Sequence, residues 1–200
     1  MSENAVAARP QSRIAKLGLY ARDLLQSVHL KYRLANFLCG ILPDDASGPI
    51  RTWCYRRIGL DVAHGAFIMS NLRLVSGVEG FYSKLHVGPG VVTGSRITIN
   101  LDATVTIGKN VSLGPDVIIY TGTHPLGPGS QRRLSDIIAK PVTIEDGCWV
   151  GLAAIILPGI TIGHGSVVAA GAVVTQDVPP DSYVEGNPAQ VVRKLPLGNR

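Results

Sequence analysis

A six-residue repeat in the C-terminal half of the chain limits the folds open to this sequence. Every sixth residue is aliphatic at nine positions, with one interruption after the third. A period of six matches neither the α-helix nor a long alternating strand, but it matches a short strand followed by a turn. The nine positions are Ile107, Leu113, Ile119, Ile144, Val150, Ile156, Ile162, Val168 and Val174.

The residues that follow each aliphatic position support the same interpretation. Most residues three positions later tolerate tight turns or a positive φ, and most residues four positions later are compact. The turn positions are Asn110, Asp116, Gly122, Gly147, Ala153, Gly159, Gly165, Gly171 and Asp177. The compact positions are Val111, Val117, Thr123, Cys148, Ala154, Ile160, Ser166, Ala172 and Val178. Three units would close one coil, and stacked coils would pair along parallel ladders, so the sequence predicts a parallel β-helix.

The repeat is weaker toward the N-terminus. Eight residues separate Ile99 from Ile107, which indicates an irregularity near residues 100–106. The six-residue interval continues before Ile99, so we expect the coils to begin near residue 62. The earlier members are Met69, Val75, Phe81, Val87, Thr93 and Ile99.

One long interruption separates Ile119 from Ile144. The stretch 124–140 is rich in glycine, proline and charge, which predicts a loop that leaves the coil and returns to it. Long loops on a repeat scaffold often carry function. Arg132 and Arg133 lie in this excursion loop; they could reach a substrate or a neighbouring subunit, but a solvated charged loop is the simpler interpretation.

Length, charge and cysteines set broad limits. The 200 residues suffice for one domain with appendages, and the net charge of +5 suits a phosphate-bearing cofactor, an anionic membrane or nucleic acid. We expect no nucleic-acid partner, because so modest an excess is common. Cys39, Cys54 and Cys148 are odd in number and form no CxxC pair, which predicts reduced thiols and a cytoplasmic location. No signal peptide or transmembrane helix is expected.

The N-terminal sixty residues have a different pattern. We expect a tail over 1–12 and a helical segment over 13–60, with a basic amphipathic helix from Ile14 that continues toward Pro43. This helix either packs on the β-helix or between subunits, which we favour, or lies on an anionic membrane. A second helix is predicted from Ser47-Gly48-Pro49 to near Gly59. Its expected buried residues are Ile50, Trp53 and Ile58.

Three segments in the repeat region resemble the hexapeptide-repeat acyltransferases, in particular the maltose and galactoside O-acetyltransferases. They cover residues 105–125, 141–163 and 171–195. The resemblance implies a mainly β fold, a left-handed parallel β-helix over 61–186, followed by a tail over 187–200. It also implies a homotrimer that binds acetyl-CoA between subunits, with no metal.

His124, within the sequence Thr121-Gly-Thr-His-Pro125, matches the catalytic histidine of this family. An imidazole titrates near neutrality, so it can take the proton of an acceptor hydroxyl that attacks a thioester. The position of Asp102 before Ile107 matches an acidic residue of the family, and coil geometry puts it beneath Tyr120. The resemblance suggests that Asp102 contacts the acceptor or orients the imidazole. A plain turn aspartate is an equal alternative.

The acceptor contacts are less certain from the pattern. The asparagine of the family falls where this chain has Gly94 and Ser95, so Asn100 is a possible substitute, and Tyr120 is the other candidate for substrate binding. Neither the acceptor nor the hydroxyl that reacts follows from the sequence.

For the cofactor, Trp149 matches a tryptophan near the pantetheine and acetyl end. Gly151 and Ala169 would allow the pantetheine arm to approach the backbone closely. Lysines common in the family are replaced by Gln176 and Gln190, which leaves other residues for the nucleotide phosphates. The full predicted cofactor set is Trp149, Gly151, Ala169, Thr175, Arg193 and Lys194.

Other functions were weighed on the same residues. A γ-class carbonic anhydrase needs clustered histidines, and no HxxxxH pair surrounds His124. A non-catalytic scaffold would leave His124, Trp149 and the excursion loop without a purpose. The sequence therefore predicts an acetyl-CoA-dependent O-acetyltransferase that acts on a sugar or glycan precursor, with no covalent carrier because Cys148 points inward. Serine, amine and antibiotic acceptors remain alternatives.

Overall fold

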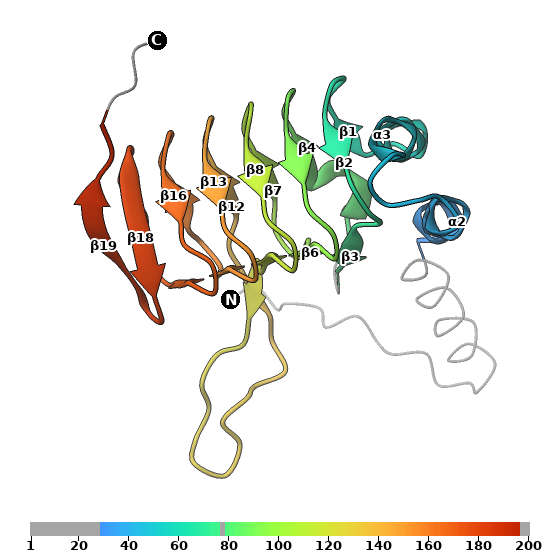
Figure 1. The fold of residues 1–200 in the computed structure, drawn as a ribbon. Coiled ribbons are helices and arrows are strands. Elements are labelled where there is room, and N and C mark those ends of the chain that lie inside the picture. Colours follow the sequence, from blue (N-terminus) through green and yellow to red (C-terminus); the bar gives the residue numbers. More distant parts are fainter. Residues whose placement is uncertain (1–28, 77–78, 197–200) are drawn as a thin grey trace, which may run out of the picture.

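The computed structural model describes residues 29–76 and 79–196 and has the shape of a three-sided prism (Figure 1). The prism is a left-handed parallel β-helix, as predicted. Three sheets form its sides, which we name sheets A, B and C in the order in which each coil passes through them. Two helices cover one end, and a hairpin projects from the body between β9 and β12.

Each sheet stacks one short strand from successive coils in register. Sheet A contains β1 (Asp61–Val62), β4 (Leu85–Val87), β7 (Val105–Ile107), β12 (Val142–Ile144) and β15 (Thr161–Ile162). Sheet B contains β2 (Phe67–Ile68), β5 (Val92–Thr93), β8 (Ser112–Leu113), β13 (Trp149–Val150), β16 (Val167–Val168), β18 (Ser182–Gly186) and β19 (Ala189–Lys194). Sheet C contains β3 (Arg73–Val75), β6 (Thr98–Asn100), β9 (Ile118–Ile119), β14 (Ile155–Ile156) and β17 (Val173–Val174).

The six-residue aliphatic positions form the core. All nine are buried, and each pairs with its counterpart in the next coil, as Ile107 does with Ile144 and Leu113 with Val150. Burying one such side chain contributes on the order of 1.5–3 kcal/mol. The aligned side chains of successive coils form one buried column in each sheet. Every further coil adds one side chain, or rung, to each column, so the stack becomes more stable as coils are added.

Seven of the nine predicted turn positions have a positive φ; Gly122 and Asp177 do not. Gly122 lies in β10 (Gly122–Thr123), where a Cβ would overlap a carboxylate oxygen of Asp102. Glycine is therefore needed there for close approach and not for backbone angle. Thr123, predicted to fill a corner, is exposed because the chain leaves the coil at this point.

The predicted rungs before Val87 were out of register by one residue. Val62, Ile68 and Leu74 are the buried members, whereas Val75 is exposed. The pairing of Ile68 with Thr93 sets this register, and a shift of one residue exchanges the two faces of a strand. The enlarged corner after β3 contains the short 3-10 helix η1 (Phe81–Ser83), in which Phe81 is buried outside the columns.

The helices α2 (Leu30–Gly40) and α3 (Gly48–Arg57) cap the first coil. Tyr32 Oη donates to the carbonyl of Leu72 and accepts from the amide of Leu74, and Tyr55 Oη accepts from the amide of Leu72. These bonds satisfy backbone groups of Leu74 in β3, an edge strand of sheet C, and of Leu72 directly before it. An edge strand without such partners would be open to pairing with another chain.

The predicted buried face of the second helix was wrong. Ile50 and Trp53 are exposed, and Ile58 is half-buried, whereas Arg51, Thr52 and Tyr55 are buried. Arg51 is drawn inward because its guanidinium donates to backbone carbonyls left free by the loop after α2 and by the first coil, including those of Leu42 and Met69. The predicted helix from Ile14 lies outside the described residues up to position 28.

The C-terminal end also differs from the expected tail over 187–200. Residues 189–194 form β19, which pairs antiparallel with β18 and adds a last strand to sheet B. Val178 and Val184 continue the buried columns, so the prism extends close to the end of the described chain.

Candidate active site

His124 lies at the base of the projecting hairpin. The hairpin pairs β10 with β11 (Ile138–Ala139) in antiparallel fashion, and a further bridge joins Leu126 to Arg133. Both ring nitrogens of His124 have partners: Nδ1 lies 2.8 Å from the carbonyl oxygen of Asp136, and Nε2 lies 2.9 Å from Arg133 Nη2.

These partners define the protonation of the ring. A carbonyl oxygen only accepts and a guanidinium only donates, so Nδ1 carries the proton and Nε2 presents its lone pair. This is the neutral tautomer in which Nε2 can act as a base. Arg133 is exposed, as expected for a solvated loop, and it also contacts the predicted catalytic residue.

A polar cluster lies in the coil directly beneath the hairpin. Asn100 is buried, with its Oδ1 2.7 Å from Thr121 Oγ1 and its Nδ2 3.0 Å from Asp102 Oδ2. Asp102 lies against Gly122 and not beneath Tyr120 as predicted. Gly122 is two residues before His124, whereas Tyr120 is four residues before it. The coil and the hairpin are thus joined through Asn100, Asp102 and Thr121.

Two further predicted residues lie at the corner between sheets C and A. Tyr120 follows β9 and is exposed, and Thr175 follows β17 and is also exposed. Backbone bonds connect successive coils at this corner, from the amide of Tyr120 to Ile156 and from that of Leu157 to Val174. Tyr120 and Thr175 are therefore two coils apart along one edge of the prism.

The remaining predicted cofactor residues lie on sheet B or at its border with sheet C. Trp149 is exposed on the outer face of sheet B, in register with Val167, which is itself in register with Tyr183. Arg193 extends this line and stacks on Tyr183, with its guanidinium carbon 4.8 Å from the ring centroid. Lys194 instead donates to the carbonyl of Pro180 and to Ser182 Oγ.

Gly151 and Ala169 lie close together at the corner between sheets B and C. A Cβ on Gly151 would fall 2.6 Å from the amide nitrogen of Ala170 and 2.9 Å from the carbonyl carbon of Ala169. Glycine is therefore required by the stacking of coils at this corner, whatever else approaches it.

The predicted residues thus form two groups that one chain does not bring together. The first group surrounds His124 at the corner between sheets C and A. The second group lies on sheet B, which is the face opposite that corner in a three-sided prism. The two groups therefore lie on different parts of the surface of one chain.

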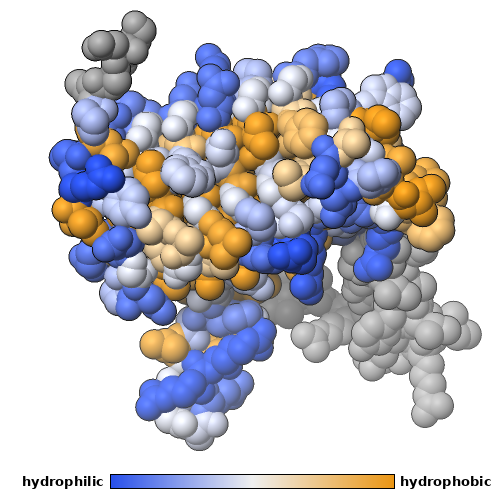
Figure 2. Space-filling view, in the orientation of Figure 1, coloured by the Kyte–Doolittle hydropathy of each residue, from blue (hydrophilic) through white to orange (hydrophobic). Residues whose placement is uncertain are grey.

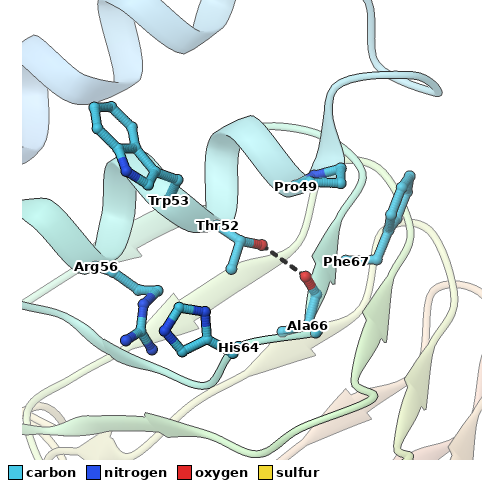
Figure 3. Close-up of a pocket in the computed structure, with 8 residues that line it drawn as sticks. Pro49, Thr52, Trp53, Arg56, His64, Ala66 and Phe67 are labelled. Atoms are coloured by element: carbon cyan, nitrogen blue, oxygen red, sulfur yellow. Dashed lines mark hydrogen bonds between the residues drawn. The ribbon is translucent and has the colours of Figure 1, made fainter.

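A cavity of about 330 Å³ lies elsewhere, between α3 and the first coil (Figure 3). Its lining includes Trp53, Arg56, His64 and Phe67, and Thr52 Oγ1 donates to the carbonyl of Ala66 at its wall. It contains no residue of the predicted site. No group of three or more potential metal ligands occurs within residues 29–76 and 79–196.

Sequence reasoning missed several residues around His124. Asp136 acts through its backbone carbonyl, and the Lys84 ammonium donates to the carbonyl of Asp102 from the enlarged corner. Neither contact has a signal in the repeat, because both come from segments that interrupt it. Antiparallel pairing within the excursion loop was the one local pattern that could have indicated Arg133.

Comparisons with known proteins agree with this architecture. A family model described as the hexapeptide repeat of succinyl-transferase matches residues 141–176. A maltose O-acetyltransferase structure from Clostridium difficile superposes with a TM-score of 0.72 at 31% identity, over 88% of this chain and 89% of that one. A hexapeptide-repeat acetyltransferase from Vibrio cholerae, solved with acetyl coenzyme A, gives 0.72 at 30% identity, over 84% of this chain and 87% of that one.

Among curated sequences, the galactoside O-acetyltransferase of Lactococcus lactis is 38% identical over 111 residues, which are 56% of this chain and 53% of that protein. The chain spans about half the length of the curated relatives it matches. Fold and repeat together define the class as hexapeptide-repeat proteins. The chain belongs to the hexapeptide-repeat acyltransferases, and its likeness is to the maltose and galactoside O-acetyltransferases.

Proposed function

We propose that this protein transfers an acetyl group from acetyl-CoA to a hydroxyl group of a sugar or glycan precursor. The observation that carries the proposal is the geometry of His124, whose Nε2 is held as a proton acceptor by the bond between Nδ1 and Asp136. Relatives named as galactoside and maltose O-acetyltransferases support both the reaction and the acceptor class.

In this reaction His124 acts as the general base. Nε2 takes the proton of the acceptor hydroxyl while the hydroxyl oxygen attacks the thioester carbonyl, the carbon–sulfur bond breaks, and the imidazolium returns the proton to the departing sulfur. The carbonyl of Asp136 keeps the ring oriented and stabilises the charge that forms on it. The buried thiol of Cys148 takes no part, so transfer is direct.

The polar cluster beneath the hairpin is the proposed acceptor site. Asp102 and Tyr120 would contact acceptor hydroxyls, because both lie at the corner from which the hairpin departs. Asn100 is buried with both side-chain polar atoms bonded, which favours a role in positioning Asp102 over direct contact with the acceptor.

The second group of residues is the proposed cofactor site. Trp149, with Gly151 and Ala169, would bind the pantetheine arm, and Arg193 with Lys194 would bind the phosphates, while Thr175 would contact the cofactor from the other edge. Because sheet B is opposite the His124 corner, we propose that a homotrimer completes the site, each His124 facing sheet B of a neighbouring copy. The acetyl-CoA complex of the Vibrio cholerae structure supports this ligand.

The proposal is tested by replacing His124 with alanine. We expect kcat to fall on the order of 10² or more while the affinity for CoA stays the same, because only the base is removed. The matched control is His64→Ala, which removes an exposed imidazole at the cavity beside α3. Release of thiol from acetyl-CoA would be followed over a panel of sugars, serine, amines and antibiotics. Equal turnover in wild type and H124A would refute the mechanism, and failure to bind CoA would favour the scaffold alternative.

We also propose that α2 places the protein on an anionic membrane surface at the cytoplasmic side. One face of α2 packs on the prism through Tyr32, Ala35 and Cys39. Its opposite face exposes a stripe of large apolar side chains, seen over α2 in Figure 2. This outer stripe consists of Leu30, Leu34, Phe37, Leu38 and Ile41.

Basic residues accompany the outer stripe. Lys31 and Arg33 are exposed on α2, and Arg57 stacks on the exposed Trp53 of α3. An apolar stripe with basic flanks is typical of helices that lie in a membrane interface. None of the described helices has the length and apolar content needed to cross a bilayer.

Cosedimentation with vesicles tests the membrane contact. Vesicles that contain phosphatidylglycerol should bind the full chain, and Leu34→Ser with Phe37→Ser should weaken binding at least about tenfold, because both side chains lie on the outer stripe. Leu126→Ser is the control, since Leu126 is even more exposed than Leu34 and Phe37 but lies on the hairpin. Equal binding of all three proteins would rule out α2 as the contact.

A further inference from the structure

Arg133 occupies the position at which an acceptor hydroxyl would have to bind. Its Nη2 lies 2.9 Å from His124 Nε2, at the one lone pair of the neutral ring. That lone pair cannot accept a proton from a substrate while the guanidinium holds it. The arginine must therefore move before the proposed reaction can begin.

The hairpin explains why Arg133 reaches the histidine. Leu126 is paired with Arg133, and His124 is two residues before Leu126, so His124 and Arg133 are diagonal neighbours across the hairpin. Diagonal pairs lie within reach of long side chains. Backbone bonds from Gly127 to Arg132 and from Leu134 to Pro125 fix this part of the hairpin.

The contact leaves the charge of Arg133 without an opposite charge. Within residues 29–76 and 79–196, no carboxylate lies within ion-pair distance of its guanidinium. A neutral ring nitrogen is a weaker partner for a cation than a carboxylate or phosphate, which carries an opposite charge and can accept two parallel N–H bonds from a guanidinium. An anion that enters the site therefore offers Arg133 a better partner than His124.

The surrounding charges also favour an anion. Arg132 lies beside Arg133 in the hairpin, and Lys84 donates to the carbonyl of Asp102 at the adjoining coil. The carboxylates of Asp102 and Asp136 oppose them, so the three cations Arg132, Arg133 and Lys84 exceed these two carboxylates by one charge.

We propose that Arg133 selects acceptors that carry an acidic group, and that binding of this group draws the guanidinium away from His124 and frees Nε2. The inference rests on the proposed acetyl transfer and names its acceptor class: a hydroxylated molecule with a carboxylate or a phosphate. Arg133 thus blocks the base until the acidic group of a suitable acceptor binds the guanidinium.

The test compares acceptors that differ only in the acidic group. Glucose is paired with glucuronate, galactose with galacturonate, and N-acetylglucosamine with its 1-phosphate, so that carboxylate and phosphate are tested separately. Binding is measured by calorimetry in the presence of CoA, and kcat and KM are measured with acetyl-CoA. Wild type should prefer the acidic member of at least one pair by about tenfold or more, a difference of about 1.4 kcal/mol.

Three substitutions separate the role of Arg133 from a general effect of positive charge. Arg133→Gln should abolish the preference, mainly through a higher KM for the acidic acceptor. Arg132→Gln removes the same charge one residue away and should keep most of the preference, because Arg132 Nη1 bonds the carbonyl of Gly127 in the hairpin, whereas Arg133 contacts His124. Arg133→Lys, which lacks the planar fork, should retain part of it.

The outcomes are distinct. Equal affinity of wild type for both members of every pair, no binding of any acidic member, or equal loss of preference in R132Q and R133Q would each overturn the role of Arg133. If wild type binds the acidic member selectively, R133Q does not, and neither protein acetylates anything, then Arg133 is an anion-binding residue and the proposed acetyl transfer is wrong.

Discussion

The orientation of the His124 ring depends on a backbone carbonyl of the excursion loop, which lies outside the six-residue repeat. The sequence around His124 predicts that this residue is the base, and this stays a prediction; in the structure its ring is bonded to the carbonyl of Asp136, twelve residues further along the excursion loop. A carbonyl partner carries no side-chain signature, so Asp136 could not be chosen from residue types. Replacing the Asp136 side chain should accordingly affect catalysis much less than replacing His124.

The buried thiol of Cys148 gives a prediction at the same scale. Burial raises the pKa of Cys148 to about 11 from an ordinary value of 9.0, because the thiolate would be poorly solvated inside the prism. The neutral thiol therefore stabilises the fold fully below about pH 9, and this contribution is lost as the pH rises toward 11.

Cys148→Ala should keep its acetyl-transfer activity and should lose less stability than wild type between about pH 8 and about pH 10. The expected difference in that loss is about 1 kcal/mol. Denaturant unfolding at both values measures it. Parallel pH dependence in the two proteins would contradict the burial argument, and loss of turnover in C148A would point to an acyl carrier.

The strands of the prism are stabilised by the columns of buried aliphatic side chains, and the column of sheet B contains one polar residue, Thr93. Thr93 is buried between Ile68 and Leu113 in sheet B, and its Oγ1 has no hydrogen-bond partner among residues 29–76 and 79–196. A buried hydroxyl without a partner costs about 1–3 kcal/mol, and valine has nearly the same shape. Thr93→Val should therefore raise the free energy of unfolding by about 1 kcal/mol, measured by urea denaturation.

The control for this change is Thr52→Val. Thr52 is also buried, but its Oγ1 donates to the carbonyl of Ala66 over 2.8 Å. The same substitution should lower stability there by about 1 kcal/mol, because the carbonyl loses its partner. Effects of the same sign at both positions would contradict the assignment of Thr93 as unsatisfied.

The cap formed by α2 and α3 depends on Arg51. Its guanidinium donates to the carbonyls of Pro43, Leu42 and Met69 and contacts Asp44. Arg51→Met should cost about 2–4 kcal/mol of stability because several carbonyls lose a charged donor. Arg57→Met, at an exposed position on the same helix, should cost less than about 1 kcal/mol. Similar losses in both variants, measured by thermal unfolding, would show that Arg51 does not hold the cap.

The buried residues of an element could be predicted where its sequence follows the six-residue repeat. From Ile107 onward the repeat predicted most core residues, because each coil has the same local geometry, but it missed Val142 and Val184 and wrongly placed Thr123 in a corner. Before Val87 it failed by one residue, since the register of Ile68 is set by its pairing with Thr93 and not by its own spacing. The inward turn of Arg51 could not be predicted either, because the carbonyls it satisfies come from several separate segments.

At the scale of the whole molecule, the position of the two groups of site residues is the main constraint. His124 projects from the corner between sheets C and A, and Trp149 lies on sheet B, the opposite face. The acceptor group on one chain and the cofactor group on another would meet only if the corner of one prism packs against the face of the next. Repeating that contact three times closes a ring.

Mixing two inactive variants measures this arrangement directly. H124A lacks the base, and Trp149→Ala lacks a proposed cofactor contact, so each alone should be nearly inactive at low acetyl-CoA concentration. After joint unfolding and refolding in equal amounts, about a quarter of the sites should pair an intact His124 with an intact Trp149 from a neighbouring chain. Recovery of roughly that fraction of wild-type acetyl transfer is the predicted result. If the refolded mixture is no more active than the two variants measured apart, the site does not lie between copies of this chain.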